Sequence, residues 1–332
     1  MTTASSAPGV LGRARELVDP AIAEALAGLC GELNEPAVYH FQGRGKGTRP
    51  ALAILSAEAV GAAPAVAVPG AVAIELIHDF SLIHDDIIDG DTERRHRTTV
   101  WAKFGTGVGV IAGDALHTLA FDVLLREPTP PRVKAAQHLA RAVSAMIAGQ
   151  SQDMAFGATD GVSLEQCLIM EQGKTGALLS YASSVGAMLA GADDATVEGL
   201  ADYGAHVGVA FQAVDDLLGI WGDPERTGKP AGSDLRERKK SVPVVIALNS
   251  DTSAADELAE LYARPELDEG EVHTARALVE AGGGREATRA LAHNHHNLAV
   301  AAVDALVGNQ EISEAVADEL RSMAEFIVGR DF

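Results

Sequence analysis

Apolar residues recur at spacings of three and four along most of this chain, and strand-like alternation is scarce. This period places apolar side chains on one face of a helix, and the good helix formers Ala, Leu, Glu and Arg are abundant. The pattern therefore predicts an all-α fold. The predicted helices cover residues 13–33, 49–61, 67–90, 107–126, 130–157, 163–190, 194–221, 240–249, 254–262, 271–280, 284–306 and 312–329.

The breaks between these helices carry Gly, Pro or small polar residues, and none is long enough to be a domain linker. We therefore expect a flexible N-terminal tail over 1–12 and one domain over 13–332. Long, largely apolar helices with charged ends are typical of a bundle around an interior cavity.

Charge and cysteine usage narrow the class of protein. The net charge of -21 argues against a nucleic-acid partner, because phosphate backbones need clustered Lys and Arg. Cys30 and Cys167 lie far apart in sequence, which favours two reduced thiols in a cytoplasmic protein. The apolar stretch 62–77 is shorter than the roughly 20 residues of a membrane span. We expect a soluble protein without stable membrane insertion.

An acidic stretch follows one apolar helical run. Residues 84–95 read HDDIIDGDTERR, in which Asp85 and Asp89 are four apart. On a helix they share a face, with Cβ atoms about 5–6 Å apart, so their charges repel unless a cation lies between them. Carboxylate oxygens beside a phosphate suit Mg²⁺, which keeps several waters and shares substrate oxygens. The spacing therefore predicts a magnesium site.

A second acidic pair, Asp215 and Asp216, ends another apolar helical run. A solvated helix terminus would explain one such motif, but chance rarely gives two. One pair on each of two helices that face each other across a cavity would hold several Mg²⁺ ions against one diphosphate.

Basic residues beside Gly and Pro are candidate anion sites in this acidic chain, because Arg binds phosphate through two hydrogen bonds and Lys acts as a point charge. They are Lys46, Arg49, Arg94, Arg95, Lys174, Lys229, Lys239 and Lys240. Together with the acidic pairs they predict one diphosphate bridged by Mg²⁺ and another bound by Lys, Arg and His78.

Five sequence blocks in this order resemble those of the trans-isoprenyl diphosphate synthases, the polyprenyl synthetase family, over nearly the whole chain. The blocks are GKGTRP at 45–50, ELIHDFSLIHDDIIDGDTERR at 75–95, AGD at 112–114 with GQSQD at 149–153, GKTG at 173–176, and FQAVDDLLGIWGDPERTGKPAGSDLRERKKSVP at 211–243. The resemblance implies a bundle of long helices around a deep apolar cavity, usually as a homodimer. It also implies Mg²⁺-dependent head-to-tail condensation of isopentenyl diphosphate with an allylic prenyl diphosphate.

The resemblance assigns roles to residues of this sequence. Five aspartates would hold Mg²⁺ on the allylic diphosphate: Asp85, Asp89 and Asp215 as ligands, with Asp86 and Asp216 in support. The cations expected to bind that diphosphate are Arg94, Lys174, Lys229 and Lys239. Those expected to bind isopentenyl diphosphate are Lys46, Arg49, His78 and Arg95. Lys174, Thr175 and Gln212 are the expected catalytic residues, the last two stabilising the developing carbocation.

The same resemblance bears on product length. In the family, a bulky residue about five positions before the first Asp blocks the growing chain, and here this residue is Phe80, followed by Ser81. The first motif also lacks the two-residue insertion of bacterial short-chain members. Both features favour geranylgeranyl diphosphate over farnesyl diphosphate as the product.

Two positions depart from the family pattern. Gly219 stands where many members carry the third Asp of the second motif, and Gly47 stands where many carry Arg after the Lys. We expect Gly219 to weaken metal binding modestly and Gly47 to loosen isopentenyl diphosphate binding.

Two rival interpretations stay open. A terpene cyclase also uses an aspartate-rich motif with Mg²⁺, and Asn249, Ser253 and Glu257 match the spacing of a cyclase metal motif. A helix end followed by an N-cap at Ser253 explains these residues better, because a metal motif should not straddle a turn. The other rival is a non-catalytic partner subunit, which would tend to lose the aspartate motifs that this chain keeps.

Overall fold

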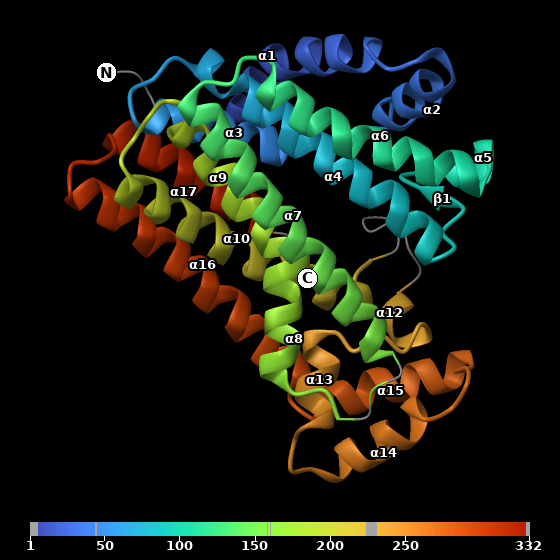
Figure 1. The fold of residues 1–332 in the computed structure, drawn as a ribbon. Helices are drawn as coiled ribbons and strands as arrows, with labels where there is room; N and C mark the ends of the chain where they lie inside the picture. The colour runs from blue at the N-terminus through green and yellow to red at the C-terminus, as the bar shows by residue number, and fades with distance from the viewer. Residues whose placement is uncertain (1–5, 44, 158, 160, 224–230, 330–332) are drawn as a thin grey trace. The chain divides into compact units, whose positions relative to one another are not determined.

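The computed structural model describes residues 6–43, 45–157, 159, 161–223 and 231–329. These residues form helices throughout, apart from one short two-stranded sheet, so the predicted all-α fold is confirmed. In chain order the elements are α1 (Ala7–Ala27), α2 (Gly31–Phe41), α3 (Thr48–Ala59), the 3₁₀ turn η1 (Pro64–Ala67), α4 (Val68–Ile88), the strands β1 (Glu93–Arg94) and β2 (Arg97–Thr98), α5 (Val100–Phe104), α6 (Thr106–Leu125), α7 (Pro130–Phe156), α8 (Leu164–Glu171), the π-helical turn η2 (Gln172–Gly176), α9 (Ala177–Leu189), α10 (Asp194–Trp221), α12 (Ser233–Arg236), α13 (Val242–Leu248), α14 (Ser253–Tyr262), α15 (Glu269–Ala281), α16 (Gly284–Gly308) and α17 (Glu314–Val328) (Figure 1).

The N-terminal part differs from the prediction. α1 begins at Ala7, so the expectation of a flexible tail is wrong for residues 7–12. The single helix expected over 13–33 is two helices, because Cys30 is extended and α2 starts again at Gly31. Asn34 Nδ2 donates a 2.8 Å hydrogen bond to Leu26 O, which satisfies a carbonyl at the end of α1.

The helix expected over 163–190 is interrupted by η2, so it consists of α8, a π-helical turn and α9. Its start agrees with the sequence, since Ser163 and Gln166 form a capping box. The hairpin of β1 and β2 and the short helix α5 were not expected.

The chain forms two compact units. Unit 1 comprises Met1–Val143, Leu178–Gly204 and Ala301–Met323, and unit 2 comprises Ser144–Ala177, Ala205–Val300 and Ala324–Phe332. The expectation of one domain over 13–332 stays a prediction.

The core of unit 1 is built around α4. Its Ile74, Leu76 and Ile77 are fully buried, and the helix packs against α3 and α6, which lie beside it in Figure 1. α9 approaches α3 closely, because Gly186 has no side chain and its N–H donates a 2.8 Å hydrogen bond to Ser56 Oγ. Burial of the apolar face of α4 fixes the position and direction of its C-terminal end.

The core of unit 2 joins the C-terminal half of α10 to α12, α13, α14 and α15. Its buried residues are Ile220, Leu235, Val244, Ala247, Leu258, Leu261, Val272, Ala275 and Val279. A second cluster packs Cys167 and Met170 of α8 against Val242 and Val245 of α13. Both helices carry predicted site residues at or beside their ends.

Two helical segments, Pro64–Ile88 and Thr106–Leu125, are long and apolar enough by composition to cross a membrane. The expectation that 62–77 was the relevant apolar stretch therefore overlooked α6. The apolar window of the first segment is 61% buried, as expected of a core helix, whereas that of α6 is 39% buried. The absence of membrane insertion stays a prediction. Both cysteines are free, as expected, with Cys30 exposed and Cys167 buried.

Candidate active site

The first aspartate motif lies at the C-terminal end of α4 in unit 1. The helix ends at Ile88, and the N–H of Asp89 donates a 2.8 Å hydrogen bond to the carbonyl of Asp85. The two residues are therefore one helical turn apart, as their spacing predicted. Asp89 is exposed and Asp85 half-buried, so both positions are open to a ligand.

Asp86, between them, is buried and paired within the protein. Its Oδ1 accepts a 2.6 Å hydrogen bond from Arg94 Nε. Burial raises the pKa of Asp86 above its ordinary value, and the guanidinium of Arg94 offsets only part of this change. In the structure Asp86 and Arg94 therefore pair with each other. The sequence had predicted that Asp86 supports a metal and that Arg94 binds diphosphate.

Arg95 is presented by the β1–β2 hairpin, in which Arg94 pairs with Arg97. The two turn residues, Arg95 and His96, have φ of 52° and 60°. Positive φ at both central positions is the type I′ arrangement that normally selects Asn or Gly, so these residues carry backbone strain. The sequence RRHR lacks that turn signal, which is why the hairpin was missed. The turn directs Arg95 Nη1 to Gly43 O, 2.9 Å away.

The residues predicted to bind isopentenyl diphosphate are in unit 1. Lys46 and Arg49 come from the loop before α3 and its first turn, His78 from α4 and Arg95 from the hairpin. The pKa of His78 lies well below its ordinary value, first because of burial and then because of the positive charges of Arg49 and Arg95. His78 is thus a neutral imidazole close to two guanidinium groups, a suitable hydrogen-bonding group beside an anion.

One buried pair beside this group was not predicted. His40 Nε2 of α2 and Asp79 Oδ1 of α4 are 3.0 Å apart, and both side chains are 11% exposed. Asp79 directly follows His78, so the pair fixes α2 against the turn of α4 that carries His78. No local sequence signal connects residues 40 and 79.

Phe80, the predicted chain-length residue, is buried, with 8% of its surface exposed. Its ring meets those of His84 and His117 edge-on, at centroid distances of 4.9 and 5.2 Å. The aromatic ring is therefore supported from its own helix and from α6. The neighbouring Ser81 Oγ donates a hydrogen bond back to His78 O within the helix, at 2.8 Å.

In unit 2, close backbone contact fixes Lys174. A Cβ atom at Gly149 of α7 would overlap the backbone of Lys174, and one at Gly173 would lie 2.9 Å from Ala145 O. These glycines let α7 and η2 touch along their backbones. Lys174 Nζ then donates a 2.6 Å hydrogen bond to Asp153 Oδ2, at the end of the GQSQD block. Asp153 had not been given a role.

Thr175, Gln212 and Asp216 form a connected chain of hydrogen bonds. Thr175 Oγ1 donates to Gln212 Oε1 at 2.9 Å, and Gln212 Nε2 donates to Asp216 Oδ1 at 3.0 Å. The other oxygen of Asp216 accepts from Val242 N at 2.9 Å. Because both ends of the Gln212 amide are engaged, its orientation is fixed.

Lys239 lies beside this series of hydrogen bonds, with its Nζ 4.0 Å from Asp216 Oδ1. Burial lowers the pKa of Lys239, but the carboxylates of Asp216 and Asp234 raise it, and the net change is upward. Lys239 is therefore a stable cation beside the second aspartate motif. Lys229 lies outside the described residues.

Glu171, just before η2, is a buried acid that the sequence did not single out. It is 2% exposed. Its pKa lies well above the ordinary value, because of burial first and the neighbouring Asp216 second. Its Oε2 is buried and has no hydrogen-bond partner among the described residues.

The carboxylates predicted to bind a metal offer hard oxygens. Asp85 and Asp89 in unit 1 and Asp215 in unit 2 are each half-buried or exposed. Within the described ranges no three acidic, His or Cys side chains converge as a metal cage. Carboxylates suit Mg²⁺, which usually binds through one or two of them and takes its remaining oxygens from water and substrate phosphates.

The cyclase-like spacing at 249–257 is interrupted, as expected. Asn249 caps the end of α13 and donates to Val162 O at 2.9 Å, whereas Ser253 begins α14. Thr252, rather than Ser253, is the N-cap residue, so that detail of the prediction is wrong. The three residues do not form one continuous helical motif.

Comparisons with known proteins agree with the sequence blocks. The family model described as "Polyprenyl synthetase" matches residues 31–279. A (2E,6E)-farnesyl diphosphate synthase from Mycobacterium bovis is 43% identical over 97% of this chain and 92% of its own length. A geranylgeranyl diphosphate synthase from Mycobacterium tuberculosis is 38% identical over 91% and 90%. The crystal structure of a polyprenyl synthetase from Streptomyces coelicolor A3(2) matches with a TM-score of 0.90 and 46% identity over 96% and 98% of the two chains.

Proposed function

Because this chain belongs to the polyprenyl synthetase family and is a prenyltransferase, we propose that it condenses isopentenyl diphosphate with an allylic diphosphate to make geranylgeranyl diphosphate. Prenyl diphosphate synthesis is common to the relatives, but their products differ in length. The product of this chain is therefore a proposal that depends on its own residues.

Asp85, Asp89 and Asp215 would hold Mg²⁺, which when bound neutralises charge on the allylic diphosphate. Arg94, Lys174 and Lys239 bind the same diphosphate and stabilise the negative charge that develops as it departs. Gln212 directs a fixed amide dipole toward the positive charge left on the allyl group, and Thr175 orients it. Charged and polar groups that are already oriented stabilise the charges of the transition state most effectively, because they need no reorganisation during the reaction.

Lys46, Arg49, Arg95 and the neutral His78 bind isopentenyl diphosphate. Attack of its double bond on the allylic cation forms the new carbon–carbon bond, and loss of a proton restores a double bond. The departing diphosphate accepts that proton, as the family resemblance implies, so no carboxylate of the chain has to act as the base.

Phe80 carries the proposal for product length. It lies five residues before Asp85, about 7.5 Å along the helix axis. A buried ring that is supported by His84 and His117 cannot easily turn aside, so it limits the growing chain from below. Farnesyl diphosphate is the second candidate product, favoured by the 43% identity to the Mycobacterium bovis synthase.

Product analysis tests both candidates. The purified protein would be incubated with Mg²⁺, isopentenyl diphosphate and dimethylallyl, geranyl or farnesyl diphosphate, and the products dephosphorylated and separated. We expect geranylgeraniol as the end product from every primer. Accumulation of farnesol would support the second candidate, and no prenyl alcohol from any primer would overturn the proposal. A hydrocarbon formed from geranylgeranyl diphosphate alone would instead support a cyclase.

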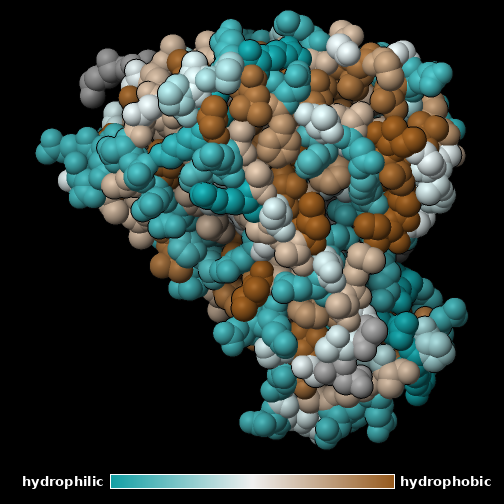
Figure 2. Space-filling view, viewed as in Figure 1, coloured by the Kyte–Doolittle hydropathy of each residue, from teal (hydrophilic) through white to brown (hydrophobic). Residues whose placement is uncertain are grey.

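We also propose that two copies of the chain pair through the outer face of α6. Val110, Ile111 and Leu125 are 39%, 55% and 42% exposed. Ile111 and Leu125 are about four turns apart and share a face. Figure 2 shows hydrophobic residues among polar ones over the region where Figure 1 draws α6. Ile111→Arg should yield a monomer in light scattering; an unchanged dimer, or a monomeric wild type, would contradict this pairing.

A further inference from the structure

One departure from the family pattern is Gly47, and a charged side chain from another element lies beside it. This side chain is Arg15 of α1, at a place where many members carry Arg at position 47 itself. We propose that Arg15 positions the Lys46 loop in place of the missing arginine. This inference rests on the proposed function.

Arg15 contacts the loop just before Lys46 and lies beside Gly47, just after it. Its Nη2 donates a 2.9 Å hydrogen bond to the carbonyl of Gly45, the residue before Lys46. A Cβ atom at Gly47, the residue after it, would lie 3.6 Å from Nε and 3.8 Å from Cγ of Arg15. The Arg15 side chain therefore lies directly against the space that a side chain at 47 would enter.

The backbone of this loop explains why Arg15 matters. Gly47 has φ of 71°, in the left-handed region that glycine adopts without strain, and it precedes the first turn of α3. A glycine at such a position is also the most flexible residue unless its neighbours restrain it. Arg15 restrains the loop at Gly45 O, and Arg95 restrains it at Gly43 O. Two guanidinium groups thus fix the backbone that leads into Lys46.

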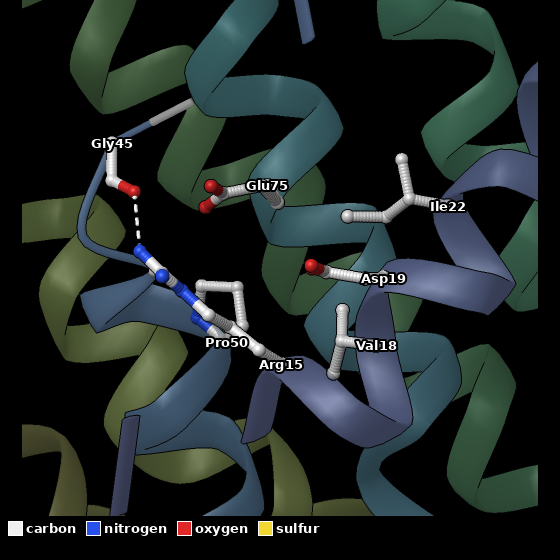
Figure 3. A pocket seen from close by; sticks show the side chains of 8 residues that line it. Arg15, Val18, Asp19, Ile22, Gly45, Pro50 and Glu75 are labelled. Atoms are coloured by element: carbon white, nitrogen blue, oxygen red, sulfur yellow. Dashed lines mark hydrogen bonds between the residues drawn. The ribbon is translucent and has the colours of Figure 1, made fainter. Parts of the chain in front are cut away.

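The surroundings of Arg15 favour this placement. Figure 3 shows Arg15 reaching from α1 to the Gly45 carbonyl, in a pocket that Asp19 and Glu75 also line. Asp19 of α1 and Glu75 of α4 place negative charge in the same pocket as the Arg15 guanidinium. The hydrogen bond to Gly45 O is the contact that fixes Arg15 against the loop.

Kinetics separate a positioning role from a structural one. In Arg15→Ala we expect KM for isopentenyl diphosphate to rise about tenfold, near the lower end of what one hydrogen bond from a charged donor controls. The KM for the allylic substrate and kcat should change little, because Arg15 contacts only this loop's backbone. Arg15→Lys should recover part of the loss, and Gly47→Arg in the Arg15→Ala background should recover part by restoring a guanidinium.

Arg13→Ala is the matched control. Arg13 lies on the same helix but pairs with Glu319 at 2.7 Å and Glu58 at 3.4 Å. It should lower the melting temperature without changing KM for isopentenyl diphosphate. Calorimetric titration of isopentenyl diphosphate supplies a readout that needs no turnover. Equal affinity in wild type and Arg15→Ala would overturn this role, whereas absent turnover by the wild type would overturn the proposed function.

Discussion

Arg94 Nε donates a 2.6 Å hydrogen bond to Oδ1 of Asp86, a side chain that is 2% exposed. The guanidinium is 30% exposed, so water screens part of its charge. Burial consequently raises the pKa of Asp86 more than Arg94 lowers it. Ionisation of Asp86 therefore destabilises the folded state, whereas the ionised carboxylate fixes the position of Arg94.

Asp86→Asn should therefore stabilise the protein at neutral pH while impairing turnover. The folded-state pKa of Asp86 lies above its unfolded value, so the stability present below the unfolded pKa is lost as pH rises through the folded pKa. The gain of the variant should be absent below the ordinary pKa of 3.8, grow as pH rises through the folded-state pKa, and stay constant above it. Turnover should fall about tenfold, because Arg94 loses an ionic partner.

Urea unfolding of both proteins without Mg²⁺, at several pH values, measures this difference. Asp122→Asn changes an exposed acid that pairs with Arg126 on the surface, and it should alter neither quantity. A variant less stable than wild type at pH 7 would show that Arg94 outweighs burial.

Gly149→Ala should destabilise unit 2 by roughly 1–3 kcal/mol, the usual cost of overpacking. The added methyl group would overlap the backbone of Lys174. Displacement of η2 would also separate Lys174 from Asp153, so diphosphate affinity should fall with stability. Chemical denaturation and calorimetric titration with inorganic diphosphate measure the two effects.

Gly12→Ala is the opposite control, because nothing lies within 4 Å of a Cβ atom at that position in α1. It should stabilise the protein by up to about 1 kcal/mol through helix propensity. If Gly149→Ala behaved like Gly12→Ala, the backbone contact between α7 and η2 would be dispensable.

Phe80→Ala should lengthen the product by one or more isoprene units, because it removes the supported ring below Asp85. Chromatography of the dephosphorylated products, with mass spectrometry, measures the distribution. Phe121→Ala is the control, since its ring meets that of His117 in α6, with the two centroids 5.3 Å apart. An unchanged product in Phe80→Ala would show that another residue limits chain length.

Stability should decrease in mildly acidic solution through His295. Its Nδ1 lies 3.1 Å from Nδ1 of His206, and burial, followed by the charge of His206, lowers its pKa below 6.5. The folded protein then binds fewer protons than the unfolded chain, so stability is complete above pH 6.5 and falls as pH drops toward the folded pKa.

His295→Asn should flatten this part of the pH–stability curve, as measured by thermal unfolding between pH 5 and 8. His293 is exposed on the same helix, so His293→Asn should leave the curve unchanged. Equal slopes in wild type and His295→Asn would assign the acid sensitivity to other groups.

Local patterns were sufficient for most helices and for the identity of the motifs. The apolar period predicted α4, α6, α7 and α10 to within a few residues, because an amphipathic helix needs only its own sequence and a core to pack on. The turn between Asp85 and Asp89 followed from helical geometry alone. Where local signals were weak, at Cys30 and at the Arg95–His96 turn, the prediction failed.

The sequence alone determined a helical fold with two aspartate motifs, since periodicity and motif spacing are local properties, and its resemblance to the polyprenyl synthetase family implied a prenyltransferase. Only the tertiary structure decided which side chains support those motifs. Asp153 beside Lys174, Arg15 beside Gly47 and Asp234 beside Gly219 meet through packing between separate elements. Such contacts depend on how helices pack in space, which residue spacing within one helix does not encode. The sequence therefore could not show that a charged side chain from another element lies beside Gly47 and beside Gly219.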